Sequence, residues 1–469
     1  MAGPTGKGWY DVTDFADSGG KAQSIADGST LATSAIQAAI DTAAASGGGT
    51  AYVPPGRYLT GAIVLRDNVT LHLEGGAVLL GSPDPAHYPA TASRWEGIEQ
   101  STHAPLVGGS GLRNIALVGR GTIDGQGQPW WARHRDKTLQ LPRPRLISFH
   151  DCSNVLIEGL TLVNSPSWTV NPICCDNVTI SKLSICNPAD SPNTDGINPE
   201  SCSNVHISNC HVDVGDDCVT IKSGTESIPP GRRRACQNIT ITNCTMVHGH
   251  GGVVIGSEMS GDVRNVTISN CVFVGTDRGI RIKSRRGRGG IVEDIRVSNV
   301  VMDEVLCPFI MNLYYYCGPG GKDDRVRDKN PLPVDDSTPR FRRVHLSHIT
   351  ARNVHYAAAF IYGLAEMPVE DLTLDDVVVS MKSGAQAGKP AMMADFQPVA
   401  QAGIFCWNAR DIRLTNVRID NQIGAALDLR DARGIVVDHL RASPPATGPA
   451  VTMAGCRDVR IDGSVAVGS

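Results

Sequence analysis

A short strand-like pattern recurs along this chain, and it restricts the possible folds more than any other feature. In many copies an asparagine precedes alternating apolar residues, as in "DNVTLHL", "CSNVLIEGLTL" and "CDNVTISKLSI". Many successive copies lie about 23 to 30 residues apart, which is the coil length of a β-solenoid rather than of a helical repeat. The period of two indicates short strands with one buried face. We therefore predict an all-β solenoid that forms a single domain over residues 1–469.

The copies align at a first apolar position, which we call the anchor. Equivalent positions of successive coils stack about 4.8 Å apart, so the anchors are predicted to form buried columns. Asparagines directly before the anchors, such as Asn154, Asn177 and Asn204, are expected to form a ladder of side-chain amides at a turn. The anchors are Val69, Ile115, Val155, Val178, Val205, Ile239, Val266, Ile295, Leu372 and Ile412.

Eight of the 14 cysteines follow the same repeat. One group stands three residues before an anchor, and a second group stands five residues after one. A small thiol packs well in such a column, and no paired CxxC motifs indicate a zinc site. We predict that these cysteines are buried packing residues. The groups are Cys152, Cys175, Cys202, Cys236 and Cys456, and Cys210, Cys244 and Cys271.

Two segments depart from the repeat. Residues 30–46 have the apolar spacing of a helix, and glycines 47–49 end it, so we predict a helix that caps the solenoid at its N-terminal end. The apolar face of this helix would consist of Ile36, Ala39, Ile40 and Ala43. Residues 306–340 are predicted to form a loop that leaves the stack near a cleft.

The composition excludes several classes of partner. Lys plus Arg number 43 and Asp plus Glu 47, and aromatic residues make up 5%, which argues against nucleic acid. No apolar run approaches the roughly 20 residues of a membrane span. The N-terminal segment lacks the apolar core of a signal peptide. We therefore expect a cytoplasmic protein, or a periplasmic or secreted one if a leader has been removed; the oligomeric state stays open.

Four segments superpose without a gap and bring polar side chains to one outer face. They are "NTDGINPES" at 193–201, "GDDCVTIKS" at 215–223, "GHGGVVIGS" at 249–257 and "TDRGIRIKS" at 276–284. In this register Asp195 is predicted to stack on Asp217, and Asp216 on His250. Taken singly, each feature is more often structural, but their convergence on one face favours catalysis. This face would carry Asp195, Asp216, Asp217, His250, Arg281 and Lys283.

Three clustered carboxylates suit acid–base chemistry. Their mutual repulsion costs on the order of 1–3 kcal/mol, which raises the pKa of at least one of them. One aspartic acid could then protonate a leaving oxygen while its ionised neighbours activate water. In an inverting glycosidase the two carboxyl groups lie roughly 6.5–9.5 Å apart. Within the same motif, Cys218 and Lys222 are predicted to be scaffold and groove wall.

At these four segments the chain resembles glycoside hydrolase family 28, the polygalacturonase family. The family's signatures occur in order as "NTD" (193–195), "GDD" (215–217), "GHG" (249–251) and "RIK" (281–283). The resemblance implies a right-handed parallel β-helix that hydrolyses pectic polysaccharide with inversion, without a metal or other cofactor. Its expected partner is an acidic pectic polysaccharide or oligogalacturonide.

The resemblance also implies roles for individual residues. Asp216 would be the general acid, and Asp195 and Asp217 would hold and deprotonate the attacking water. His250 would support the acid. The remaining positions would bind substrate: Asn193 at the turn, Arg281 and Lys283 on a galacturonate carboxylate, and Tyr315 as an aromatic contact.

The subtype and three alternatives stay open at this stage. "TDRGIRIKSRRGRGG" and "NLYYYCGPGGKD" look similar to bacterial exo-acting members, so release of galacturonate or a short oligomer from the non-reducing end is expected. A rhamnogalacturonan-directed hydrolase would share the fold and the acids. A β-helical pectate lyase would use calcium, and a non-catalytic polysaccharide-binding β-helix would not need three clustered acids.

Overall fold

The chain forms two compact units of parallel strands, Met1–Asp216 and Asp217–Ser469. The structure is a computed structural model that describes residues 8–16, 25–318, 320–445, 448–462 and 466–467. The boundary between the units falls between the two aspartates of the "GDD" motif.

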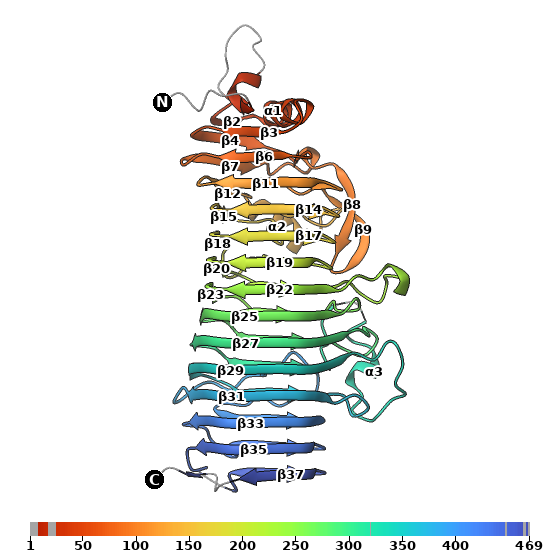
Figure 1. Ribbon diagram of the computed structural model, residues 1–469, viewed down its shortest axis with the longest axis vertical. Helices are drawn as coiled ribbons and strands as arrows, with labels where there is room; N and C mark the ends of the chain where they lie inside the picture. Colours follow the sequence, from red (N-terminus) through yellow and green to blue (C-terminus); the bar gives the residue numbers. More distant parts are fainter. Residues whose placement is uncertain (1–7, 17–24, 319, 446–447, 463–465, 468–469) are drawn as a thin grey trace. The chain divides into compact units, whose positions relative to one another are not determined.

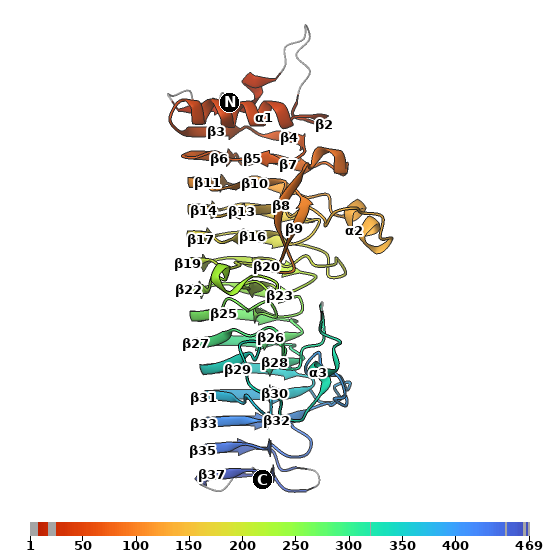
Figure 2. The ribbon, with the colours of Figure 1, turned by 90° about the vertical axis from the view of Figure 1, so that its right-hand side faces the viewer.

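In the first unit, parallel strands stack coil upon coil in three columns (Figures 1 and 2). One column contains β1 (Trp9–Asp11), β3 (Gly49–Val53), β6 (Val69–Leu73), β11 (Arg113–Gly119), β14 (Ser153–Glu158), β17 (Asp176–Ser181) and β19 (Ser203–Ser208). The next contains β2 (Asp27–Leu31), β4 (Gly56–Thr60), β7 (Ala77–Gly81), β12 (Thr122–Asp124), β15 (Thr161–Val163), β18 (Ser184–Cys186) and β20 (His211–Val214). The third contains β5 (Ile63–Val64), β10 (Val107–Ser110), β13 (Ile147–His150) and β16 (Val170–Ile173).

The in-register pairing produces the predicted buried columns. Ile115 pairs with Val155, Val155 with Val178, and Val178 with Val205, and each of these side chains is at most 2% exposed. Burying an aliphatic side chain of this size contributes about 1.5–3 kcal/mol. The alternating partners, such as Thr179, stay partly exposed because successive side chains of a strand point to opposite faces.

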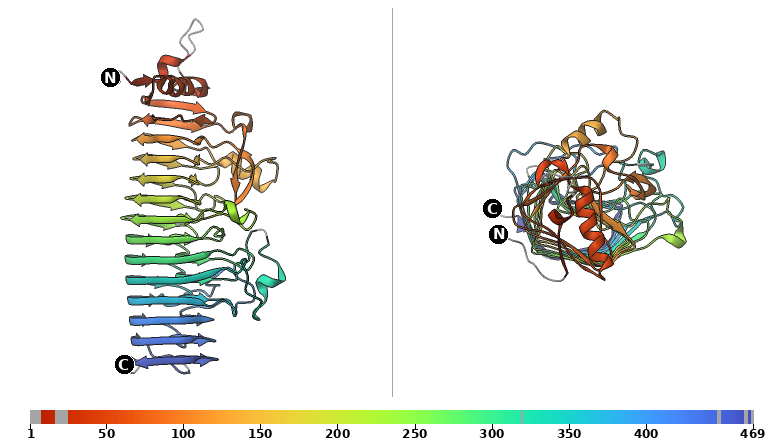
Figure 3. Two further views of the ribbon diagram at one scale, coloured as in Figure 1. Left: turned by 45° about the vertical axis from the view of Figure 1, so that its right-hand side comes forward. Right: turned by 90° about the horizontal axis from the view of Figure 1, so that it is seen from above.

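Helix α1 (Thr33–Ala45) lies across the first coils of its unit, as the view from above in Figure 3 shows. The four apolar residues predicted for its inner face are completely buried. The helix ends at Ser46, and the following Gly47 and Gly48 have φ of 88° and 131°, conformations that favour glycine. A helix thus occurs in the predicted segment, but it begins at Thr33 rather than at residue 30, because residues 30 and 31 belong to the preceding strand. The other helices are η1 (Val12–Phe15), η2 (Pro85–His87) and α2 (Gln128–Arg135), and an antiparallel hairpin joins β8 (Ala90–Trp95) to β9 (Ile98–His103).

The second unit repeats the same construction with longer strands (Figure 1). An eight-stranded parallel sheet contains β21 (Val219–Ile221), β24 (Val253–Ile255), β26 (Arg278–Lys283), β28 (Cys307–Asn312), β30 (Ala357–Tyr362), β32 (Ala402–Trp407), β34 (Leu427–Arg430) and β36 (Val451–Ala454). The other strands are β22 (Cys236–Thr242), β23 (Thr245–His248), β25 (Val263–Val274), β27 (Ile291–Asp303), β29 (Arg340–Val354), β31 (Val369–Met381), β33 (Ala409–Asp420), β35 (Arg433–Ala442), β37 (Arg457–Asp462) and β38 (Ala466–Val467). Short helices η3 (Pro230–Arg232) and α3 (Asp324–Arg327) lie in the connections.

The residue before each anchor adopts a left-handed backbone conformation. Asn154 and Asn177 have φ of 54° and 60°, a region that asparagine tolerates better than most residues. Their side chains also form the predicted ladder: Asn177 donates to Asn154 at 2.8 Å, and Asn154 donates to Asn114 at 2.8 Å. The side chain of the next asparagine, Asn204, donates to Asp176 at 3.0 Å.

The cysteines are packing residues, as predicted. All 14 carry free thiols, and Cys152, Cys175 and Cys202 are at most 2% exposed. Hydrogen bonds within the column and burial raise the pKa of the Cys152 thiol far above its ordinary value. A thiol with a raised pKa is a poor nucleophile. Cys456 is the least buried member of the predicted columns.

The predicted loop and the predicted repeat both differ from the structure. Cys307–Asn312 form β28, so the segment that leaves the stack begins at residue 313 rather than at 306. Two copies of the repeat were not predicted: β29, where Val344 pairs with Ile295, and β35, where Ile435 pairs with Ile412. Arg343 and Gly434 take the left-handed position there, with φ of 54° and 67°, so the asparagine signal is absent from both.

Apart from the hairpin, the named strand pairs of both units are parallel, and the mostly β chain has the predicted right-handed parallel β-helix fold. Among the described residues, no helix is long and apolar enough to cross a membrane.

The left-handed turn can be tested at Asn177. Asn177→Gly should lower the free energy of unfolding by about 1 kcal/mol, because the ladder hydrogen bond is lost. Asn177→Ala should cost about 1–2 kcal/mol more, because alanine is strained at this φ. The measurement is the shift in urea midpoint, with Thr179→Ala on the same strand as the control. An alanine variant as stable as the glycine variant would contradict the argument.

Candidate active site

Asn193 and Asp195 lie in the turn between β18 and β19. Asn193 has φ of 54°, as expected of a residue that shapes a turn. The carbonyl oxygen of Asp195 accepts a hydrogen bond from the amide of Thr169 at 2.9 Å. Its carboxylate is 3% exposed, and Oδ2 accepts a hydrogen bond from Asn198 Nδ2 at 2.9 Å. The position of this carboxylate is therefore held from both backbone and side chain.

Asp216 follows β20 and is only partly buried. The glycine before it is required by close packing, since a Cβ at Gly215 would lie 2.6 Å from the carbonyl oxygen of Pro188. This packing brings the two acidic turns of the first unit together. One carboxylate oxygen of Asp195 lies within 4.8 Å of one of Asp216.

Arg143 contacts the turn that contains Asn193, and it was not predicted from the sequence. Its guanidinium is 1% exposed and donates to Asn193 Oδ1 at 2.7 Å and to the carbonyl oxygen of Pro192 at 2.7 Å. Burial lowers the pKa of Arg143 to about 10, although the charges of nearby acids, Asp195 and Asp216 among them, act in the opposite direction. Arg143 therefore stays cationic, holds the Asn193 turn and places positive charge near both acids. No motif marks its segment, "LPRPRL".

In the second unit, Asp217 binds both cations of the "RIK" strand. Lys283 Nζ lies 2.9 Å from Asp217 Oδ2, and Arg281 Nη1 lies 3.3 Å from Oδ1. Arg281 and Lys283 stand two apart on β26, so both project from one face of the sheet, as predicted. All three side chains are less than 10% exposed.

The ion pairs decide the charge of Asp217. Burial raises the pKa of this carboxyl, but the charges of Lys283 and Arg281 and the hydrogen bond from Lys283 outweigh burial and hold it well below its usual range. Asp217 is therefore ionised at neutral pH.

Tyr315 and Met392 cover the two cations. The Tyr315 ring centroid lies 5.1 Å from Lys283 Nζ and 5.8 Å from the Arg281 guanidinium carbon. Arg281 Nη2 also contacts Met392 Sδ at 2.9 Å. The prediction that Tyr315 is the aromatic residue at this site agrees with these contacts. Burial raises the pKa of Tyr315 well above its usual value, so the phenol stays neutral.

His250 lies in an exposed turn between β23 and β24. Its carbonyl oxygen lies 3.5 Å from Arg281 Nη1, and its charge when protonated would help to lower the pKa of Asp217. The two glycines that follow have a packing reason. A Cβ at Gly252 would lie 2.7 Å from the Phe273 ring, and one at Gly251 would meet Val254 at 2.4 Å.

Lys222, predicted to belong to the groove wall, is part of an ion-pair network. Lys222 Nζ lies 3.4 Å from Glu258 Oε2. Burial raises the pKa of Glu258, but the charges of Lys222, Arg288 and Lys283 outweigh burial and lower it to about 2. Arg288 in turn pairs with Glu226 at 2.6 Å, and so does Arg285 at 2.7 Å. The charge of Glu258 thus also acts on Lys283. No motif in the sequence marks Glu258.

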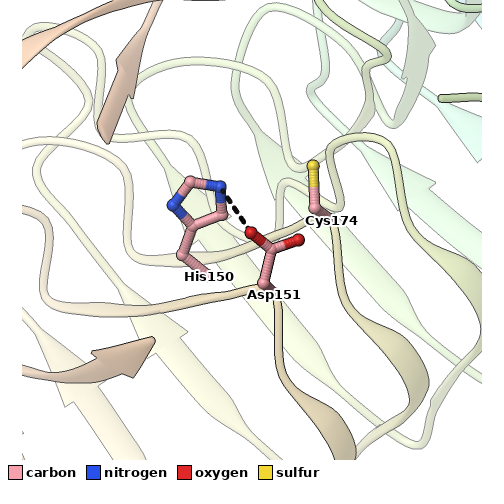
Figure 4. A group of neighbouring side chains, drawn as sticks. All are labelled: His150, Asp151 and Cys174. Atoms are coloured by element: carbon pink, nitrogen blue, oxygen red, sulfur yellow. Dashed lines mark ion pairs between the residues drawn. The ribbon is translucent and has the colours of Figure 1, made fainter. Parts of the chain in front are cut away.

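One further group of side chains has the donors of a metal site. His150, Asp151 and Cys174 offer ligand atoms that all lie within 4.8 Å of one another (Figure 4). His150 Nε2 lies 3.6 Å from Asp151 Oδ2. Histidine, thiolate and carboxylate are zinc ligands, yet the charge of Arg94 helps to lower the pKa of His150 and opposes a bound cation. This group has no link to the sequence motifs.

The structure thus assembles the predicted residues in two sets. Asn193, Asp195 and Asp216 belong to the first unit, and Asp217, His250, Arg281, Lys283 and Tyr315 belong to the second. The predicted stacking of Asp195 on Asp217, and of Asp216 on His250, relates the two sets and stays a prediction. The second set contains an ionised carboxylate beside two cations and an aromatic ring. Such a set can hold an anionic substrate group next to a base.

Comparison with known proteins agrees with this chemistry. Residues 86–392 match the family described as Glycosyl hydrolases family 28. A probable polygalacturonase of Vitis vinifera is 34% identical over 372 residues, which cover 77% of this chain and 74% of that protein. An endo-polygalacturonase of Pectobacterium carotovorum subsp. carotovorum is 32% identical over 271 residues, which cover 55% and 65%.

A solved structure shares the fold. The crystal structure of a hyperthermoactive exopolygalacturonase from Thermotoga maritima has a TM-score of 0.71 at 29% identity, and the match covers 88% of this chain and 92% of that one. The motifs, the fold and the family match agree. The chain belongs to glycosyl hydrolase family 28 and is a glycoside hydrolase.

Proposed function

We propose that this enzyme hydrolyses α-1,4-galacturonosidic bonds of pectic polymers or oligomers. The observation that carries the proposal is the cluster of Arg281, Lys283 and Tyr315 around Asp217. An arginine fork and a lysine ammonium together match the carboxylate that distinguishes galacturonate from neutral sugars. The relatives from Vitis vinifera and Thermotoga maritima, which are named as polygalacturonases, support the same substrate class.

In this proposal the two consecutive aspartates have different roles. Asp216, which is partly exposed, protonates the leaving oxygen. Asp217, which is buried and ionised, takes the proton of the attacking water together with Asp195. His250 supports the acid. Asn193 contacts the sugar from a turn that Arg143 holds in place.

The substrate's own carboxylate contributes to the base. Before substrate binds, Lys283 and Arg281 lower the proton affinity of Asp217. When a galacturonate carboxylate binds the same two cations, it takes up part of their positive charge. Asp217 then becomes a stronger base at the moment when water must be deprotonated. A neutral sugar would bind without this change.

We also propose that the reaction inverts the anomeric centre, in line with the family resemblance. An inverting pair of carboxyl groups is usually roughly 6.5–9.5 Å apart. One carboxylate oxygen of Asp195 lies within 4.8 Å of one of Asp216, which is shorter than that spacing. The assignment of the attacking water to Asp195 and Asp217 rests on the family resemblance.

Attack from the chain end is the finer part of the proposal. A long connection leads from β28 to β29, and Arg286 holds it through hydrogen bonds. The Arg286 guanidinium donates to the carbonyl oxygens of Arg325 and Asn330 and pairs with Glu366 at 2.6 Å. A connection fastened in this way can act as a fixed wall beside Tyr315. Among the relatives, the Thermotoga maritima enzyme is named an exopolygalacturonase and the Pectobacterium enzyme an endo-polygalacturonase.

Two alternative activities can be distinguished from the proposed one by their reaction products. A rhamnogalacturonan-directed hydrolase would release reducing sugar from rhamnogalacturonan faster than from polygalacturonate. A pectate lyase would need calcium and would form unsaturated products that absorb in the near ultraviolet. The ion pairs at Asp217 favour a hydrolase, because two cations occupy a carboxylate that a calcium ion would need.

One NMR time course on oligogalacturonides tests the reaction, its stereochemistry and its direction. The expected first product is galacturonate or a short oligomer from the non-reducing end. Its anomeric signal should be the β form, because inversion of an α bond produces it, with mutarotation following later.

The control is a parallel viscosity measurement on polygalacturonate. A slow fall in viscosity relative to the release of reducing ends agrees with attack at chain ends. A rapid fall with mixed oligomers would reject the exo assignment, and an α product formed first would reject inversion.

The carboxylate-binding role of Lys283 predicts a substrate-dependent loss. Lys283→Met should lower kcat/KM on oligogalacturonide by about 10- to 100-fold, because a charge-assisted hydrogen bond is lost. On a methyl-esterified oligomer the same substitution should have a much smaller effect. The exposed Lys389→Met serves as the matched control and should leave both rates unchanged. Equal losses on both substrates would contradict direct binding of the carboxylate.

The two aspartates of the motif should differ in their effect on stability. Asp216→Asn should lower kcat by about 10²- to 10⁴-fold with little change in the free energy of unfolding. Asp217→Asn should also remove activity, and it should destabilise the chain by about 3–5 kcal/mol, because two buried cations lose their partner.

The stability that ionised Asp217 contributes should depend on pH. The folded pKa of Asp217 is lowered, so its contribution to stability is present above the unfolded pKa of about 3.9 and is lost as the pH falls below it. The difference in unfolding midpoint between wild type and Asp217→Asn should therefore be largest near neutral pH. A difference that grows in acid would contradict the ion-pair argument.

A further inference from the structure

The second unit contains a pocket of about 620 Å³, and none of the proposed catalytic residues lines it. Its wall contains the last residues of three neighbouring strands: Tyr362 of β30, Trp407 of β32 and Arg430 of β34. Lys329, from the connection between β28 and β29, also lines the pocket. The pocket therefore combines aromatic rings with positive charge.

The strand register relates this pocket to Lys283. Lys283 pairs with Asn312, Asn312 with Tyr362, and Tyr362 with Trp407, so Trp407 lies three strands from Lys283, about 14 Å. Asn312 is 1% exposed, and its amide reaches the carbonyl oxygen of Met392 at 3.4 Å. The pocket is thus a separate site in the same sheet.

Lys329 has the buried ammonium group of this pocket, and among the described residues its hydrogen-bonding capacity is not satisfied. Its Nζ atom is buried and has no hydrogen-bond partner within the described part of the chain. The ammonium lies 3.4 Å from the Tyr314 ring centroid and 5.6 Å from that of Tyr362. Aromatic faces compensate a buried cation only in part. The charges of Asp395 and Asp328 also act on this ammonium, but among the described residues no carboxylate is hydrogen-bonded to it.

The pocket's arginines, in contrast, already have acidic partners. Arg430 pairs with Asp428 at 3.0 Å. Arg410 and Arg433 pair with carboxylates in the same way. They surround the pocket with positive charge, but Lys329 is the cation that an incoming anion would neutralise.

Trp407 provides the second half of the site. Its ring packs edge to face against Tyr362 at 5.0 Å, and the Arg430 guanidinium carbon lies 4.1 Å from its centroid. The indole Nε1 is also buried without a hydrogen-bond partner among the described residues. An unsatisfied indole N–H can donate to a hydroxyl group. A ligand with a carboxylate and a hydroxylated ring would satisfy both Lys329 and Trp407.

We propose that this pocket binds an acidic sugar unit, with its carboxylate on Lys329 and its ring against Tyr362 and Trp407. It would give the enzyme a second contact with the polysaccharide it degrades. The identity of the sugar as galacturonate rests on the proposed function, whereas the carboxylate rests on Lys329 alone.

The test is a titration of galacturonic acid, which has no glycosidic bond to cleave, into wild type, Lys329→Met and Lys283→Met. Wild type should show two classes of site. Lys329→Met should weaken one class at least about tenfold and leave the other unchanged, and Lys283→Met should do the reverse. The control Lys322→Met, an exposed lysine of the same connection, should keep both classes. Galactose, which lacks the carboxylate, should not occupy the Lys329 site.

A thermal unfolding measurement without ligand separates binding from folding. Lys329→Met should unfold no earlier than wild type, because it removes a buried ammonium that has no hydrogen-bond partner among the described residues. Earlier unfolding of Lys329→Met would overturn the proposal in favour of a structural contact with Tyr314. Unchanged galacturonate binding by this variant, or equal binding of galactose, would overturn it as well.

The proposed function and the pocket can fail separately. Hydrolysis of polygalacturonate with only one class of galacturonate site rejects the pocket and leaves the function. Lys329-dependent binding of galacturonate without hydrolysis of polygalacturonate rejects the function and supports the pocket.

Discussion

Hydrogen bonding between parallel strands in register determines where every side chain of each unit can go. Because β24 and β26 pair residue by residue, Val253 lies against Ile280 and Val254 against Arg281. A shift of one residue would turn Arg281 and Lys283 inward and Ile280 outward. Left-handed residues such as Asn177, the second residue of β17, recur at the same position in successive coils and so mark this register. The site is therefore a consequence of the same repeat that forms the core.

The second constraint is electrostatic, and it explains why so many charges tolerate burial. A buried charge is costly unless it is paired, and the buried charges around the "RIK" strand lie in ion pairs. The network contains Lys222, Arg281, Lys283, Arg285 and Arg288 on one side and Asp217, Glu226 and Glu258 on the other.

Much of the fold and the predicted site residues could be read from the sequence because both depend on local periodicity. The anchors, the capping helix and the outward direction of Arg281 follow from spacing along one strand or helix. Arg143 and Glu258 could not be found in this way, since their partners are set by loops whose path has no period. The copy in β29 was missed because Arg343 stands where the repeat normally has asparagine or aspartate. Lys329 likewise becomes visible only when its connection is folded against Tyr314.

The pair of aspartates that marks the site illustrates how one backbone can create two chemical environments. Asp216 and Asp217 lie in the bend between β20 and β21, and they differ in burial although they are neighbours in the chain. Asp217 points to the cations of β26 and is 2% exposed, while Asp216 stays partly open to solvent. In the proposed mechanism the acid must be able to hold a proton, and the base must stay ionised. Buried ion pairs with Arg281 and Lys283 fix the charge of Asp217, so its surroundings suit the proposed base.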